Sequence, residues 1–284
     1  MSPFRVSAIS YLNTAPLMWN FEHGSDSVEL RKVFEVDYTL PSRCAQMLAE
    51  GSADIGIIPV AAYTTVPGLL VLPDVAIASR GAVRSILLIS QRPWSEIRSV
   101  ALDSSSRTSA ALVQVLLKMQ NREVALAPAE PNLDAMLKRY DAALLIGDPA
   151  LEVDRTQYQT WDLAEEWRNL TGKPFVFAFW AVREGAASEE QLSRAAEVFR
   201  ESRDEGLKHI PEIATEWSSQ LSISEQTIRS YLRENIHYYL GTESISGMKL
   251  FFELAASYEI LPTAPELRLA PELAFRNSTH QSSV

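Results

Sequence analysis

The stretch Phe4–Pro16 (FRVSAISYLNTAP) predicts a strand, a polar loop and the start of a helix. The apolar run Phe4–Ile9 is typical of a short buried strand, and Thr14 and Pro16 are typical of the cap and first turn of a helix. In an open α/β fold such a loop lies at the carboxyl edge of the sheet, where helix N–H groups converge and ligands bind. Asn13 is therefore a candidate ligand contact, although the stretch could also be only a helix cap.

The rest of the first 80 residues continues this alternation of strand and helix. Strands are expected at 33–40, 53–59, 69–72 and 75–79, and Ser42 is the expected N-cap of a helix that follows the first of them. Alternating strands and helices are typical of an α/β fold built on a mainly parallel sheet.

Past residue 80 the pattern indicates a second unit and a return of the chain. A strand at 85–90 leads to an α/β block over 100–146, and the apolar run 175–182 is long enough to cross back to the first unit. From Ser188, a capping-box residue, the pattern is helical, with one helix expected over 224–239. Two crossovers create an interdomain cleft, a favoured place for a small ligand. The expected boundaries are domain 1 at 1–90 and 179–262, an inserted domain 2 at 91–178, and a flexible tail at 263–284.

Composition narrows the class of protein. The chain of 284 residues carries 26 Lys and Arg against 36 Asp and Glu, a formal net charge of −10 that argues against broad binding to nucleic acid. No apolar run approaches the roughly 20 residues that span a bilayer, and the amino-terminal segment lacks the pattern of a signal peptide. The single cysteine, Cys44, excludes an intrachain disulfide, and the four histidines have no metal-ligand spacing. We therefore expect a cytoplasmic protein that holds no metal and binds neither nucleic acid nor a membrane.

A second polar stretch, Asp103–Ser109 (DSSSRTS), follows a predicted strand and opens a helix at 108–119. Hydroxyl groups, one guanidinium and free helix N–H groups together suit an anion such as a carboxylate or a phosphate. The alternative is a hydroxyl-rich helix cap beside a surface arginine. We favour anion binding, by Ser105, Ser106, Arg107, Thr108 and Ser109.

Other polar residues follow strands or flank turns. Gly147 and Asp148 come after a predicted strand, where Asp148 could orient a hydroxyl, transfer a proton or only cap a turn. Ser79 and Ser85 flank a glycine turn at the first crossover, and could bind a ligand or terminate strands. Trp180, near the return crossover, could line the cleft or pack in the core.

These stretches occur in one order along residues 4–260, together with motifs on the segments between them. The additional motifs are PSRCA at 41–45, DIGIIPV at 54–60, Thr171-Gly172 and PFVFAFW at 174–180. As a set they resemble the chorismate dehydratases, the first enzymes of the futalosine route to menaquinone.

The resemblance implies a fold, a reaction and two catalytic residues. The fold is that of the two-domain periplasmic solute-binding proteins of type II. The reaction is the loss of water from chorismate to give 3-[(1-carboxyvinyl)oxy]benzoate, with neither a metal nor an organic cofactor. The asparagine of the family's first loop corresponds to Asn13 and its serine after the glycine turn corresponds to Ser85. Ala82 stands in that turn where family members often have proline.

The chemistry of this reaction fits the polar stretches. We expect Ser106, Arg107, Thr108 and Ser109 to bind one substrate carboxylate at the helix start, and the substrate's own enolpyruvyl carboxylate to act as the base. The remaining expected substrate contacts are Ser42, Ser79, Ser105, Gly147, Asp148 and Trp180.

Two other functions compete with this one. The sister enzyme that makes 1,4-dihydroxy-6-naphthoate has the same fold, but Tyr11-Leu12-Asn13 differs from its first loop and disfavours it. A non-catalytic cytoplasmic protein that binds a small carboxylate would use the same cleft. Incubation with chorismate alone separates these possibilities.

Overall fold

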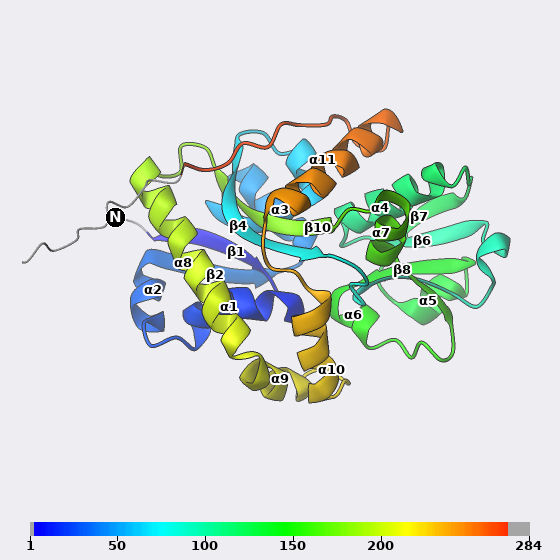
Figure 1. Ribbon diagram of the computed structural model, residues 1–284, viewed down its shortest axis with the longest axis horizontal. Coiled ribbons are helices and arrows are strands. Elements are labelled where there is room, and N and C mark those ends of the chain that lie inside the picture. Colours follow the sequence, from blue (N-terminus) through cyan, green and yellow to red (C-terminus); the bar gives the residue numbers. More distant parts are fainter. Residues whose placement is uncertain (1–2, 272–284) are drawn as a thin grey trace, which may run out of the picture.

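The computed structural model describes residues 3–271, which form two α/β domains, each built around a five-stranded sheet (Figure 1). Sheet 1 has the strand order β2 (Phe34–Thr39), β1 (Phe4–Ile9), β3 (Ile55–Pro59), β10 (Phe175–Arg183) and β4 (Leu69–Ser79). Sheet 2 has the order β7 (Ala125–Ala129), β6 (Ser99–Asp103), β8 (Ala142–Ile146), β5 (Ile86–Ser90) and β9 (Gln159–Asp162).

Each sheet has a parallel part and an antiparallel part. Strand β1 is parallel to β2 and β3, and β6 is parallel to β7 and β8. The crossover strands are antiparallel: β10 to β3 and β4, and β5 to β8 and β9. The predicted α/β fold class is confirmed.

Helices cover both sheets. Domain 1 carries α1 (Ala15–Glu22), α2 (Ser27–Val33), α3 (Pro41–Glu50), α8 (Glu189–Lys208), α9 (Ile210–Ser218), α10 (Glu225–Ser230) and α11 (Thr242–Ser257), with 3₁₀ turns η1 (Leu12–Thr14) and η2 (Val60–Thr64). Domain 2 carries α4 (Arg107–Met119), α5 (Leu133–Leu137), α6 (Gly147–Leu151) and α7 (Leu163–Thr171), with the 3₁₀ turn η3 (Trp94–Glu96). The helix α11 packs on β10 and also contacts α4 of the other domain.

The strand pairing changes the expected domain boundaries. The expectation assigned residues up to 90 to domain 1, but β5 pairs along its whole length with β8 in sheet 2. The expected boundary at 178 falls inside β10, which lies in sheet 1 from Phe175 onward because Phe175 pairs with Ser79. An apolar run of this kind can be buried in either sheet, so its composition does not tell which sheet it joins.

The segment before residue 272 is bound to the sheet rather than free. Val71 N donates to Arg268 O and Ala270 N donates to Val71 O, both at 2.8 Å, so this segment covers the edge strand β4. Arg268 N also donates to the Tyr63 hydroxyl at 3.1 Å. The prediction of a flexible tail is therefore wrong for residues 263–271, and the rest of it, 272–284, lies outside the described residues.

The helix expected over 224–239 ends early. α10 stops at Ser230 and is followed by one π-helical turn, η4 (Tyr231–Asn235). The chain then extends, because His237 exchanges backbone hydrogen bonds with Ala78 at the end of β4 (2.7 and 2.9 Å). Pairing with a distant strand overrides the local helical pattern. It also places η4 beside the first crossover.

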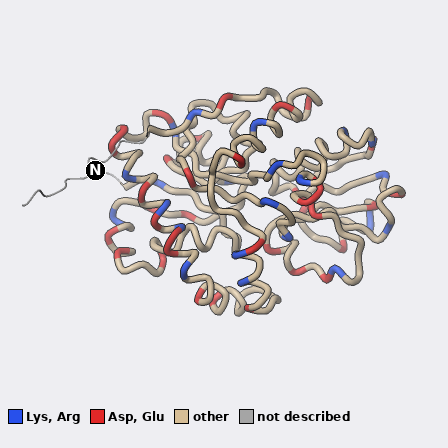
Figure 2. The backbone as a smooth tube through the Cα atoms, viewed as in Figure 1, with Lys and Arg blue, Asp and Glu red and all other residues tan. Residues whose placement is uncertain are grey.

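Charged residues occur throughout both domains. Figure 2 shows basic and acidic residues interspersed along the chain. None of the helices within residues 3–271 is both long and apolar enough to cross a membrane.

Candidate active site

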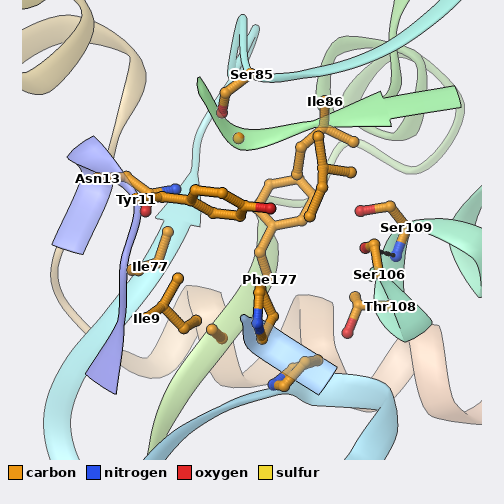
Figure 3. A pocket seen from close by; sticks show the side chains of 15 residues that line it. Ile9, Tyr11, Asn13, Ile77, Ser85, Ile86, Ser106, Thr108, Ser109 and Phe177 are labelled. Carbon is orange, nitrogen blue, oxygen red and sulfur yellow. Dashed lines mark hydrogen bonds between the residues drawn. The ribbon is translucent and has the colours of Figure 1, made fainter. Parts of the chain in front are cut away.

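A pocket of about 440 Å³, counting its open mouth, lies between the two domains. Both domains line it (Figure 3). Its polar lining comes from Tyr11, Asn13, Ser85, Ser106, Thr108 and Ser109, and its large apolar lining from Ile9, Ile77, Ile86, Ile146 and Phe177. Among the described residues, this lining includes no charged side chain. An anion in this pocket would therefore be held by neutral donors.

The first loop lies at the carboxyl end of β1, as predicted, and Asn13 lines the pocket. The Leu12 N–H donates to both carboxylate oxygens of Asp148 in domain 2, at 3.1 and 3.2 Å. The Thr14 hydroxyl does not cap α1 but donates to Asn13 Oδ1 at 3.4 Å. The loop is therefore more than a helix cap, because it joins the domains.

Tyr11 extends from this loop across the pocket toward domain 2 (Figure 3). Burial raises the pKa of Tyr11 above its usual value, and the neighbouring Ser105 hydroxyl has a smaller, opposing effect. The Ser105 hydroxyl in turn donates to Asp103 at 2.6 Å. Ser105 therefore lies beside Tyr11 and outside the pocket lining.

The start of α4 forms the opposite wall. Ser106 is the N-cap, and its hydroxyl accepts from Ser109 N at 3.2 Å. Within residues 3–271 no partner is found for the backbone N–H groups of Arg107 and Thr108, so this helix end has free donors. The Thr108 hydroxyl accepts from Ala61 N of η2 at 3.0 Å, another link between the domains. The structure thus brings Ser106, Thr108 and Ser109 to the pocket.

Ser85 lies on the same side of the pocket as Asn13 (Figure 3). Its Oγ accepts a hydrogen bond from the Tyr231 hydroxyl at 2.9 Å, and the Asn13 side chain lies beside that hydroxyl. Burial raises the pKa of Tyr231, so its hydroxyl stays protonated. The sequence reasoning missed Tyr231, which occupies an apolar position of an expected helix; the only available signal was that a buried tyrosine hydroxyl needs a partner.

Asp148 lies beside the pocket without lining it. Burial, with a smaller contribution from Glu152, raises its pKa to about 7 against the opposing hydrogen bond from Leu12 N–H. Its neighbour Gly147 does line the pocket, with a φ of +63°. Asp148 therefore supports the loop that carries Asn13.

Several expected contacts lie elsewhere. Arg107, the first residue of α4, is exposed. Its side chain faces solvent and is not part of the pocket lining. Ser42 is neither the N-cap of α3, which is Leu40, nor part of the lining. The Ser79 hydroxyl donates back to Gly81 O at 2.7 Å and shapes the turn.

Trp180 is a core residue rather than a pocket residue. It is fully buried in the middle of β10 and packs against Phe199 of α8, with 4.3 Å between ring centroids. The prediction that it contacts the substrate is wrong. Its position between the sheet and a covering helix uses its large apolar surface for packing.

No metal-binding cluster of three or more His, Cys, Asp or Glu side chains is found within residues 3–271. Cys44 lies in the core, where burial raises its pKa to about 11. A thiol with so high a pKa is a poor nucleophile.

With this geometry in view, the comparisons with known proteins identify the family. A family model described as menaquinone biosynthesis matches residues 4–257. The chain belongs to this menaquinone biosynthesis family. The assignment confirms the resemblance drawn from the order of the motifs. The chain is similar to the chorismate dehydratase of Thermus thermophilus. The two are 30% identical over an alignment that covers 93% of this chain and 98% of the relative.

Solved structures show how this member of the menaquinone biosynthesis family folds. A protein from Archaeoglobus fulgidus superposes with a TM-score of 0.75 at 17% identity, covering 91% of this chain and 98% of its own. The periplasmic aliphatic sulphonate binding protein of Escherichia coli gives 0.66 at 14% identity, covering 97% and 96%. At such low identity these likenesses concern the fold alone. They confirm the predicted two-domain periplasmic-binding-protein fold of type II.

Proposed function

We propose that this protein is a chorismate dehydratase, a cofactor-independent carbon–oxygen lyase that converts chorismate to 3-[(1-carboxyvinyl)oxy]benzoate and water. One observation carries the proposal: the uncharged pocket places the donors of a helix start opposite Asn13 and Ser85, in a member of the menaquinone biosynthesis family. The 30% identity to a chorismate dehydratase supports the same substrate. The proposal includes the cytoplasmic location expected from the sequence.

The start of α4 binds one carboxylate of the substrate in this proposal. The free N–H groups of Arg107 and Thr108 and the hydroxyl of Ser109 supply the donors, and the positive end of the helix dipole favours an anion there. The apolar side chains Ile77 and Phe177 line the space for the ring and exclude water. Arg107 contributes its backbone and not its guanidinium.

The reaction needs orientation more than a strong acid or base. The C3 proton is removed, its bonding electrons form the C3–C4 double bond, and the C4–oxygen bond breaks to release hydroxide, which becomes water with that proton. The new ring is aromatic, which drives the step. The substrate's enolpyruvyl carboxylate removes the proton, in keeping with a described pocket lining that offers neither carboxylate nor histidine. Ser85 and Asn13 bind the departing hydroxyl and hold the reacting ring.

Mass spectrometry of a reaction with chorismate alone tests the proposal. Purified protein, treated with a chelator and given no cofactor, is expected to convert chorismate to a product lighter by one water. Asn13→Ala is expected to abolish most turnover while the protein remains folded by circular dichroism. Ser42→Ala, which lies outside the pocket lining, is the matched control and keeps wild-type turnover.

Other outcomes would point to the competing functions. Chorismate that binds and is recovered intact would indicate a binding protein, as for the sulphonate-binding protein of the same fold. Failure to bind chorismate at all would favour the sister enzyme of the route. Full activity of Asn13→Ala would remove Asn13 from the mechanism but leave the reaction standing.

A further inference from the structure

Tyr231 reaches the pocket wall from a distant part of the chain. It is fully buried, begins the π-helical turn η4, and lies 146 residues from Ser85 in sequence. π-Helical turns are rare and occur often at functional sites. Asn235, at the end of the same turn, donates through Nδ2 to Ala82 O at 2.9 Å, so η4 is fixed to the crossover that carries Ser85.

The hydrogen bond between Tyr231 and Ser85 has a definite direction. The single hydroxyl proton of Tyr231 goes to Ser85 Oγ at 2.9 Å. The Tyr231 hydroxyl is therefore the donor and Ser85 Oγ the acceptor.

This direction determines what Ser85 can do. Because Ser85 Oγ accepts from Tyr231, its own O–H must point elsewhere, and among the described residues no acceptor for that proton is found. Ser85 lines the pocket, so the acceptor available to it is a ligand oxygen. A hydroxyl without such a partner would rotate among its staggered positions.

We propose that Tyr231 is a positioning residue that orients the Ser85 hydroxyl as a donor to the substrate oxygen; this inference rests on the proposed dehydratase function. Tyr231 does not line the pocket and acts through Ser85.

Tyr238 offers a matched control in the same segment. Like Tyr231 it is fully buried, but its hydroxyl has no hydrogen-bond partner among the described residues. Removing that hydroxyl should therefore leave the pocket unchanged. Tyr231→Phe and Tyr238→Phe delete the same atom from two buried rings and differ only in the contact to Ser85.

The test measures kcat and KM for chorismate in both variants, with thermal unfolding of each. Tyr231→Phe is expected to lower kcat by about tenfold to a hundredfold, with KM changed less than about threefold. Tyr238→Phe is expected to keep both constants within about twofold of wild type. A wild-type kcat in folded Tyr231→Phe, or an equal loss in Tyr238→Phe, would overturn the inference. An inactive wild type would instead refute the proposed function.

A double-mutant cycle shows whether Tyr231 acts through Ser85. In a Ser85→Ala background, Tyr231→Phe is expected to change kcat by less than about threefold, because the group it orients is already gone. Removing both partners also leaves no buried orphan, so this comparison holds even if Tyr231→Phe alone fails to fold. A further tenfold loss in the double variant would mean that Tyr231 acts by another route.

Discussion

Tyr11 packs directly over Gly147: a Cβ atom at Gly147 would lie 2.7 Å from two carbons of the Tyr11 ring. Gly147 also has a φ of +63°, in the left-handed region that side chains disfavour. The two residues come from different domains, and each adjoins a residue of the Leu12–Asp148 hydrogen bond. A glycine at this position therefore lets the loop carrying Asn13 close onto domain 2.

Gly147→Ala is expected to lower both stability and kcat/KM. Gly172→Ala is the matched control, because Gly172 has a φ of +70° but nothing within 4 Å of an added Cβ. The backbone cost, about 1 kcal/mol, is common to both variants. The clash with Tyr11 should cost Gly147→Ala about 1–3 kcal/mol more and at least about tenfold in kcat/KM. Equal losses in chemical denaturation and in kcat/KM would show that the Tyr11 contact is unimportant.

Ser109→Ala and Arg107→Ala separate the wall of the pocket from the surface beside it. Ser109 lines the pocket and Arg107 does not. Loss of one hydrogen bond to a charged carboxylate should raise KM for chorismate about tenfold in Ser109→Ala. Arg107→Ala should leave KM within about twofold at roughly 0.15 M salt, where surface charge is screened. If Arg107→Ala gave the larger effect, the guanidinium would have to bind substrate.

Asp148 makes the stability of the protein depend on pH. Its pKa is raised to about 7 in the folded state, whereas an unfolded aspartate titrates near about 3.9. Between these values the folded state holds the extra proton, so the free energy of unfolding falls as pH rises, by at most about 1.4 kcal/mol per pH unit. Asp148→Asn cannot ionise and is expected to gain stability relative to wild type between about pH 5 and pH 7.

Urea denaturation at several pH values measures this difference. Asp141→Asn is the control, because hydrogen bonds from Arg98 and Ser99 lower the pKa of Asp141. Its stability contribution is lost only as pH falls toward that lowered pKa, so the Asp141→Asn difference should stay constant above about pH 5. Parallel pH curves for wild type and Asp148→Asn would contradict the raised pKa.

Gly206→Ala is expected to be strongly destabilising. A Cβ atom there would lie 2.0 Å from Pro16 O, because α8 crosses α1 at backbone contact. Separating the two helices should cost about 3 kcal/mol or more. Gly81→Ala, which meets nothing within 4 Å, should stay within about 0.5 kcal/mol of wild type. Thermal unfolding distinguishes the two, and a small shift for Gly206→Ala would show that α1 can move without loss.

Local signals in the sequence predicted part of the local structure, although Ser42 is not the N-cap of α3. The loop before α1, the hydroxyl-rich start of α4 and the capping box at Ser188 depend on neighbours within a few residues. The Ser188 hydroxyl accepts from Gln191 N, as that pattern predicts. The family resemblance added Asn13 and Ser85, whose catalytic roles stay predictions, although the structure brings both to one pocket.

Contacts between residues far apart in the sequence could not be predicted from local patterns. Strand β5 is apolar whichever sheet it joins, and Tyr231 bonds to Ser85 across 146 positions of the sequence. The sequence around Asp148 is typical of a turn residue or a group that transfers a proton. It contains no signal for the hydrogen bond with Leu12, which lies 136 positions away in the sequence. The direction of a side chain could not be predicted from the motif either. Arg107 belongs to a donor-rich motif, but its side chain faces solvent.

The pairing of Ser79 with Phe175 has a consequence for how this protein can change. The two ends of domain 2 leave and re-enter sheet 1 at neighbouring positions of an antiparallel pair, about 5 Å apart. Domain 2 is inserted between β4 and β10, so replacing it would interrupt none of the five strands of sheet 1. Such a replacement would keep Asn13 and Tyr231 and would exchange Ser85, Ser109 and the rest of the pocket wall that domain 2 supplies. One wall of the pocket can therefore change with domain 2 while the strands of sheet 1 and the wall from domain 1 stay the same.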